Sequence, residues 1–174
     1  MSAKDLASKK LPAGWADDVL HFWFEELDQK DWFSSSTRVD EICRARFGDI
    51  YAALKAEPPA PESLGARTLL PAVIVFDQFP RNIFRNTPVA YATDANALAL
   101  ARHAVESGKD RTLPEMQRHF VYMPFMHSED LMAQAESVRL FTALGESDGA
   151  KYARHHHGVI ERFGRFPHRN SILG

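Results

Sequence analysis

The chain has 174 residues, of which 45% are hydrophobic and 25% are charged, and its formal net charge is −2. This length suffices for one domain with a hydrophobic core, so the composition excludes a chain that is disordered throughout. The small net charge predicts neither nucleic-acid nor membrane binding. The single cysteine, Cys43, excludes an intrachain disulfide and fits a reducing compartment.

The N-terminal residues are polar, and the longest apolar runs are far too short to cross a bilayer. We therefore expect a cytoplasmic protein. We also expect residues 1–174 to form a single domain in which residues 1–13 are a flexible extension.

Apolar residues recur mostly at intervals of three and four, which is the spacing of amphipathic helices. The first such stripe consists of Trp15, Val19, Trp23 and Leu27. The second consists of Val39, Ile42, Cys43, Phe47, Ile50, Tyr51 and Leu54. Thr37 with Asp40 resembles a capping box for the second helix, with Ser36 as the alternative N-cap, and the prolines of residues 57–61 end it. Cys43 is thus predicted to be a core residue.

Residues 63–79 form the next apolar element, and their β-branched centre also suits a buried strand. We predict a helix, because nothing else in the sequence is typical of a strand that could pair with it. Pro71 is expected to kink this helix or to lie near its start.

The later helices are predicted from capping signals as well as from apolar spacing. Thr87 and Pro88 are typical of an N-cap and first helical residue, and residues 95–105 are strongly helical. Thr112 and Glu115 indicate a capping box for a helix that Pro124 interrupts. Ser128 is the expected N-cap of a helix over residues 129–144. A last helix begins at residue 147 or 148 and carries Tyr152, His156, Val159, Ile160 and Phe163 on one face.

These elements add up to about seven helices joined by short loops, without a linker or a strict repeat. The predicted fold class is therefore all-α, with the helices in antiparallel hairpins.

Three segments of the chain resemble a known bacterial family. They are FDQFPRNIFR (residues 76–85), YMPFMHSEDLMAQAESV (122–138) and RFGRFPHRNSILG (162–174). They are similar to the signature segments of domain of unknown function 924, whose fold resembles the tetratricopeptide-like (TPR-like) helical superfamily. The resemblance extends from about Val19 to the C-terminus. It implies an all-α, TPR-like fold and no established activity.

The chain differs from the family pattern in two places. Members usually continue beyond the Leu-Gly with an arginine, a Ser-Thr pair and acidic residues, so we expect a flank of the site to be missing here. Members also tend to carry an acid near the position of Gly158.

Two of these segments repeat a pattern in which Phe-Pro is followed within three residues by Arg-Asn. Proline takes the chain out of the preceding helix and holds the next residues on a short turn. If the two turns meet, their guanidinium groups form a basic patch suited to a carboxylate or phosphate. The candidate ligand-binding residues are Asp77, Gln78, Arg81, Asn82, Arg85, Glu129, Asp130, His156, Arg165, Arg169 and Asn170. A purely structural role remains open, because Asp77, Glu129, Asp130 and Glu161 are available to neutralise the arginines.

Residues 127–130 read His-Ser-Glu-Asp, which places an imidazole beside two carboxylates. His127 is a candidate general acid or base, as is His168. His127 and Asp130 with a further histidine could also hold a metal, or the segment could simply cap a helix. Of the three consecutive histidines 155–157, only His156 falls on the apolar stripe of its helix, because successive residues point about 100° apart.

No phosphate-binding glycine loop, dinucleotide fingerprint, nucleophile elbow or paired-cysteine motif is present. We therefore predict no cofactor and no metal. The favoured function is binding of a small anionic ligand, with acid–base or hydrolytic chemistry at His127 or His168. The alternative is a TPR-like interaction module that binds a protein or an acidic peptide.

Overall fold

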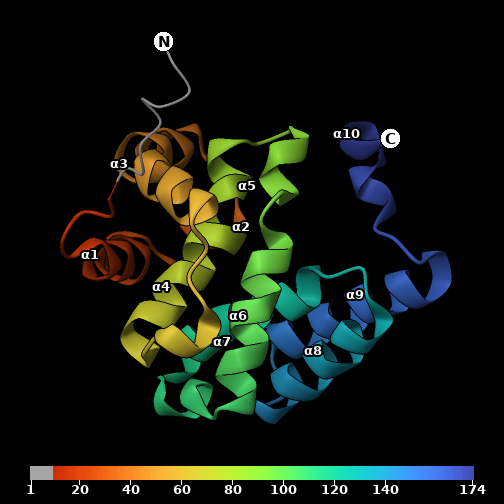
Figure 1. The fold of residues 1–174 in the computed structure, drawn as a ribbon. Helices are drawn as coiled ribbons and strands as arrows, with labels where there is room; N and C mark the ends of the chain where they lie inside the picture. Colours follow the sequence, from red (N-terminus) through yellow and green to blue (C-terminus); the bar gives the residue numbers. More distant parts are fainter. Residues whose placement is uncertain (1–9) are drawn as a thin grey trace.

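The structure is a computed structural model that describes residues 10–174. All regular elements in this range are helical and none is a strand, so the predicted all-α class is confirmed (Figure 1). Residues 1–9, the larger part of the predicted N-terminal extension, lie outside the described residues.

The longer helices account for most of the chain. They are α1 (Trp15–His21), which continues as a π-helical turn over Phe22–Glu26, α3 (Thr37–Ala56), α4 (Ala66–Asp77), α6 (Asp94–Glu106), α7 (Glu115–His127), α8 (Leu131–Ala143) and α9 (Asp148–Phe163). Shorter helices are α2 (Gln29–Phe33), α5 (Phe79–Ile83) and α10 (Asn170–Leu173). Single 3-10 turns cover Pro61–Ser63, Pro88–Tyr91, Lys109–Thr112 and Pro167–Arg169.

Helix α4 lies at the centre of the molecule. It packs against α1, α3, α6 and α7, and every residue from position 69 to 77 is buried. A helix that is apolar on all sides must be covered on all sides, which explains why its composition also suited a buried strand. In Figure 1 the chain proceeds from α1 and α3 on one side, through α4, α6 and α7, to α8 and α9 on the other. Neighbouring helices along the chain, such as α7 with α8 and α8 with α9, pack together, which is compatible with a TPR-like arrangement.

One of the two proline predictions is wrong. For Pro71, the structure excludes only the alternative of a position near the helix start, because α4 begins at Ala66 and contains Pro71 in its interior. Pro124 does not interrupt its helix, since α7 continues through it to His127. An interior proline removes one backbone hydrogen bond, and here both rings are buried in the core. Packing around the prolines therefore outweighs the lost bond.

Two of the predicted helix caps are wrong. Thr112 forms no capping box, because its hydroxyl donates to the carbonyl of Lys109 at 2.7 Å. Ser128 is not the N-cap of α8. The cap is Asp130, whose carboxylate accepts the N–H of Ala133 at 3.0 Å, while the Ser128 hydroxyl accepts the N–H of Asp130 at 3.1 Å.

The capping assignment predicts different costs for two neighbouring substitutions. Asp130→Ala is expected to lower the free energy of unfolding by about 1 kcal/mol, because it leaves a helix N–H without its acceptor. Ser128→Ala should cost less, because Ser128 does not cap the helix itself. Urea denaturation followed by circular dichroism measures both. A larger loss for Ser128→Ala would contradict the assignment of Asp130 as the cap.

Helix α9 buries a different face from the predicted one. Tyr152 and Phe163 are 60% and 51% exposed, and the buried positions are Gly149, Ala150, Ala153 and Ile160. The small residues bring α9 close to its neighbours: a Cβ atom at Gly149 would lie 3.0 Å from the ring of Phe141 and 3.1 Å from that of His119. The buried face of α9 therefore consists mainly of small residues, and the aromatic side chains that we expected there are exposed.

Cys43 is fully buried, and burial raises the pKa of its thiol to about 12, as expected of a core residue. Within residues 10–174, no helix has both the length and the apolar character needed to cross a membrane.

Candidate functional site

The two Phe-Pro segments have the same local construction. Phe79 and Phe166 are buried, with exposures of 0% and 2%. Each following proline stands in the first turn of a new short helix, α5 in one case and the Pro167–Arg169 turn in the other. The prolines do not end the preceding helices, because α4 ends at Asp77 and α9 at Phe163. Each proline instead begins the helical turn that carries an arginine, Arg81 or Arg169.

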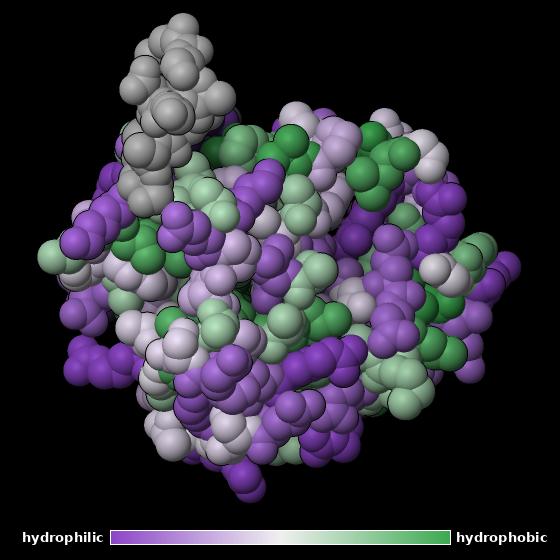
Figure 2. All heavy atoms as spheres, viewed as in Figure 1, coloured by the Kyte–Doolittle hydropathy of each residue, from purple (hydrophilic) through white to green (hydrophobic). Residues whose placement is uncertain are grey.

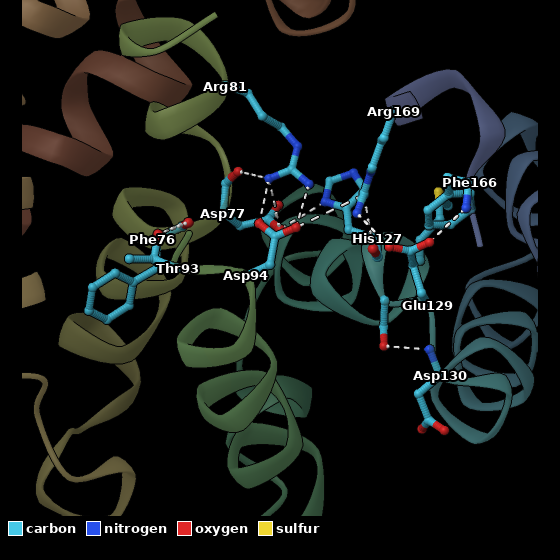
Figure 3. Close-up of polar contacts among 12 residues, drawn as sticks. Phe76, Asp77, Arg81, Thr93, Asp94, His127, Glu129, Asp130, Phe166 and Arg169 are labelled. Atoms are coloured by element: carbon cyan, nitrogen blue, oxygen red, sulfur yellow. Dashed lines mark hydrogen bonds and ion pairs between the residues drawn. The ribbon is translucent and has the colours of Figure 1, made fainter. Parts of the chain in front are cut away.

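These two arginines meet in space. Both terminal nitrogens of the Arg81 guanidinium donate to Asp94, with N–O distances of 2.8 and 3.0 Å, and Nη2 of Arg169 lies 4.0 Å from the same carboxylate. Both also lie over the ring of Tyr91, at 5.4 Å for Arg81 and 4.4 Å for Arg169. Figure 3 shows the two side chains reaching Asp94 and His127 from different parts of the chain.

Arg169 is almost fully buried and only partly satisfied. It is 7% exposed and lies between the rings of Tyr91 and Phe166, with Nη2 donating to the carbonyl of His127 at 3.1 Å. Its closest carboxylate oxygen, on Glu129, is 3.7 Å away, and its Nε is buried without a hydrogen-bond partner among the described residues. Burial, together with the charge of Arg81, lowers the pKa of Arg169. This cation therefore retains donor capacity that the fold does not use.

Asp77 and His127 form a hydrogen-bonded pair beside the arginines. Asp77 is 1% exposed, and its carboxylate accepts from Nδ1 of His127 at 2.8 Å and from Gln78 at 2.7 Å. Burial opposes ionisation, but the charges of His127 and Arg81 outweigh it and hold the pKa of Asp77 below its usual value. Because an ionised carboxylate only accepts, Nδ1 must carry the proton. Nε2 of His127 has no hydrogen-bond partner among the described residues and is free to accept.

A cavity of about 290 Å³ opens onto these groups, and we call it the cationic cavity. Its walls include Arg81, Arg85, His127, His156, His168 and Arg169, together with Asn86, Ala90, Tyr91, Phe166 and Ile172. Six of the predicted site residues thus line one cavity.

The three histidines of this wall differ in their surroundings. His127 is fixed by Asp77, whereas Nδ1 of His156 donates to the carbonyl of Tyr152 at 2.7 Å. Burial lowers the pKa of His156, and burial with the nearby charge of Arg169 lowers that of His168. Both are therefore biased toward the neutral form.

Other predicted residues are not part of the cavity wall and instead form hydrogen bonds within the fold. Gln78 binds Asp77, Asn82 donates to Asp40 at 2.9 Å, and Glu129 accepts the N–H of Phe166 at 2.7 Å. Asp130 caps α8 and is not part of the cavity wall.

Arg165 and Asn170 also lie outside the cavity wall. The guanidinium of Arg165 donates to the side chain of Asn170 and to the carbonyl of Gly174. Of the two C-terminal arginines, only Arg169 reaches the site.

Sequence reasoning missed several residues of the site. Asp94 binds Arg81, Asp40 binds Arg85 at 2.7 Å through two nitrogens, and Tyr91 and Phe166 flank Arg169. Both acids stand in the first turn of their helices, and the sequence had suggested only a capping role for Asp40 and none for Asp94. No spacing pattern connects them with the arginines, so only the packing reveals the pairs.

A second, larger cavity of about 570 Å³ adjoins the first, and we call it the apolar cavity. Its walls are Phe33, Met116, His119, Met123, Met126, Leu144, Gly149 and Tyr152, with Gln29, Glu115, Ser147 and Asp148 as polar members and His127 and His156 shared with the cationic cavity. No motif had indicated it, because its residues come from separate helices. Across residues 10–174, no three His, Cys, Asp or Glu side chains are placed to hold a metal ion.

The model of the bacterial family of proteins of unknown function DUF924 matches residues 19–174. Among solved structures, a protein of unknown function from Agrobacterium tumefaciens is similar, with 39% sequence identity and a TM-score of 0.85 over 92% of this chain and 90% of that one. No curated protein shows significant similarity to the chain.

Proposed function

The chain belongs to the bacterial DUF924 family, and from its site we propose that it binds a small molecule that carries a carboxylate or phosphate group in the cationic cavity. The observation that carries this proposal is Arg169, a buried guanidinium that lines the cavity with its Nε unpaired. A buried donor without a partner costs free energy and calls for an explanation, and a ligand bound to the same guanidinium would supply one.

The other two arginines of the wall are better explained by the fold. Arg81 is held by Asp94 and Arg85 by Asp40, each through two nitrogens. This is the structural role that the sequence left open, and it applies to these two residues. Arg169 lacks a hydrogen-bonded carboxylate, and its two aromatic neighbours hold the guanidinium plane in place. A preorganised guanidinium suits carboxylate and phosphate oxygens.

The Asp77–His127 pair favours a second candidate function, acid–base catalysis on the bound anion. A buried carboxylate on Nδ1 orients the imidazole, fixes its tautomer and leaves Nε2 as a base. His168 is exposed and has no carboxylate bonded to its ring, so His127 is the better base of the two. Hydrolysis of an ester bond in the anionic ligand is the simplest such reaction: Nε2 takes a proton from water, the water oxygen attacks the ester carbonyl, and the proton passes to the alkoxide that leaves.

Anion binding predicts a thermal shift that depends on Arg169. Inorganic phosphate or a simple carboxylate at 100 times its Kd should stabilise the wild type by about 2.7 kcal/mol, or roughly 5–10 °C in Tm. Arg169→Lys keeps the positive charge but loses the planar fork, so its Kd should rise at least about tenfold. Arg165→Lys, an exposed arginine outside the cavity, is the matched control and should behave as the wild type.

An equal shift in Arg169→Lys and wild type would place any anion binding elsewhere and refute the assignment of Arg169. The absence of any shift in the wild type would instead favour the alternative, a helical module that binds a protein or peptide.

A further inference from the structure

We propose that the ligand has two parts, an anionic head in the cationic cavity and an uncharged apolar group in the apolar cavity, with His127 at the junction. The inference rests on the proposed function and deepens it, because it states the class of ligand. The class is an amphiphile with a single anionic head group, such as a carboxylate or phosphate that bears an alkyl or aryl group.

The first argument is that the two cavities share a wall. His127 and His156 line both of them. His127 is fixed by its 2.8 Å contact with the buried Asp77, and its carbonyl accepts from Arg169. Figure 3 shows His127 beside Arg169, with Asp77, Asp94 and Glu129 close to them. A molecule bound to Arg169 therefore lies one side chain away from the apolar cavity.

The second argument is the chemistry of the apolar cavity. Three methionines, Met116, Met123 and Met126, line it together with Phe33 and Tyr152. Methionine is flexible and adapts to irregular apolar shapes. Met116, Phe33 and Tyr152 are 44%, 56% and 60% exposed, which is unusual for large hydrophobic side chains unless they contact something apolar. At about 570 Å³ the cavity is within the size range of small-molecule sites.

The third argument concerns charge, which differs between the two cavities. Arginines and histidines dominate the cationic cavity, whereas the polar members of the apolar cavity include the exposed carboxylates of Glu115 and Asp148. Burial lowers the pKa of His119 and so favours its neutral form. A second negative group on the far end of the ligand would therefore be disfavoured, which selects a ligand with one anionic head over a ligand that is anionic at both ends.

A small molecule fits these features better than a macromolecular partner. On the face shown in Figure 2, hydrophobic residues lie in small separate groups among hydrophilic ones, unlike a broad protein-binding surface. The apolar lining is concentrated in one concave site next to a buried cation, which is the arrangement expected for an amphiphilic ligand.

The test is a series of straight-chain monocarboxylates from acetate to octanoate, with monoalkyl phosphates of the same lengths, titrated by calorimetry. Affinity should rise about fourfold for each methylene that becomes buried. The α,ω-dicarboxylate of the octanoate length should bind at least about tenfold more weakly than octanoate, because its second charge faces Glu115 and Asp148.

Two variants locate the effect. Met116→Asn should lower the ratio of octanoate to acetate affinity by about tenfold, because it places an amide in the apolar wall. Met132→Asn changes a methionine that is 76% exposed and outside both cavities, so the ratio should stay at the wild-type value.

The outcomes separate the two proposals. Affinity that does not change with chain length, while acetate or phosphate binding still requires Arg169, overturns the two-part ligand and leaves the anion site standing. An equal fall of the ratio in both methionine variants also overturns it. If no member of either series binds, both proposals fail.

Discussion

Asp77→Ala is expected to lower the free energy of unfolding by about 3–5 kcal/mol, the usual cost of removing one partner from a buried charged network. Asp77 is 1% exposed and its carboxylate accepts from His127 and Gln78, with Arg81 at 3.7 Å. The substitution leaves His127 and Gln78 without the carboxylate that accepts their hydrogen bonds, and it removes a negative charge near Arg81. Asp17→Ala, which removes an exposed ion pair with Arg67, is the matched control and should cost less than about 1 kcal/mol.

The same residue predicts a pH dependence whose sign follows from the direction of its pKa shift. The pKa of Asp77 is lower in the folded protein than in the unfolded chain, where it is about 3.9. Its contribution is therefore complete above the unfolded value and disappears as the pH falls through the folded value. The stability difference between wild type and Asp77→Asn should thus shrink on acidification below about pH 4. Urea denaturation of both proteins at neutral and acidic pH measures this difference, and a constant difference would show that the carboxylate charge does not matter.

Much of the fold was predictable because helix periodicity and proline positions are local properties of the sequence. The stripe that contains Cys43 is buried as expected, and α9 ends at Gly164, whose φ of 68° suits glycine. The failures came where packing overrides local preference. Pro124 continues a helix because its ring is buried, and α9 buries small residues in place of Tyr152 and Phe163 because a neighbouring helix packs closely against it.

The site was predictable in part for a related reason. The repeated Phe-Pro pattern pointed to Arg81 and Arg169, which the structure places on one cavity wall, and each follows a buried aromatic anchor and a proline. The sequence could not distinguish Arg169 from Arg165, which is four residues away. In the structure the Arg169 side chain reaches the carbonyl of His127, whereas the Arg165 side chain reaches the carbonyl of Gly174. The partners Asp94 and Asp40 come from other helices, and no local pattern encodes them.

The repeated pattern itself can be tested by truncating its two aromatic anchors. Phe79 packs 4.8 Å from Phe47 and 5.8 Å from Trp23, measured between ring centroids, within the main core. Phe79→Ala should therefore lower the free energy of unfolding by about 3–5 kcal/mol, seen as an earlier midpoint in urea. Phe166 is equally buried, but its ring contacts His156 and the guanidinium of Arg169, and it does not belong to that core among the described residues.

Phe166→Ala should accordingly lose less stability than Phe79→Ala and more anion affinity, because it removes one of the two rings that hold Arg169 in place. Phosphate titrations of the two folded variants decide the matter. Equal losses of stability with unchanged affinity would mean that both segments only anchor the fold. The expected contrast would mean that one pattern serves two purposes, with the first copy placing Arg81 in the core network and the second presenting Arg169 to a ligand.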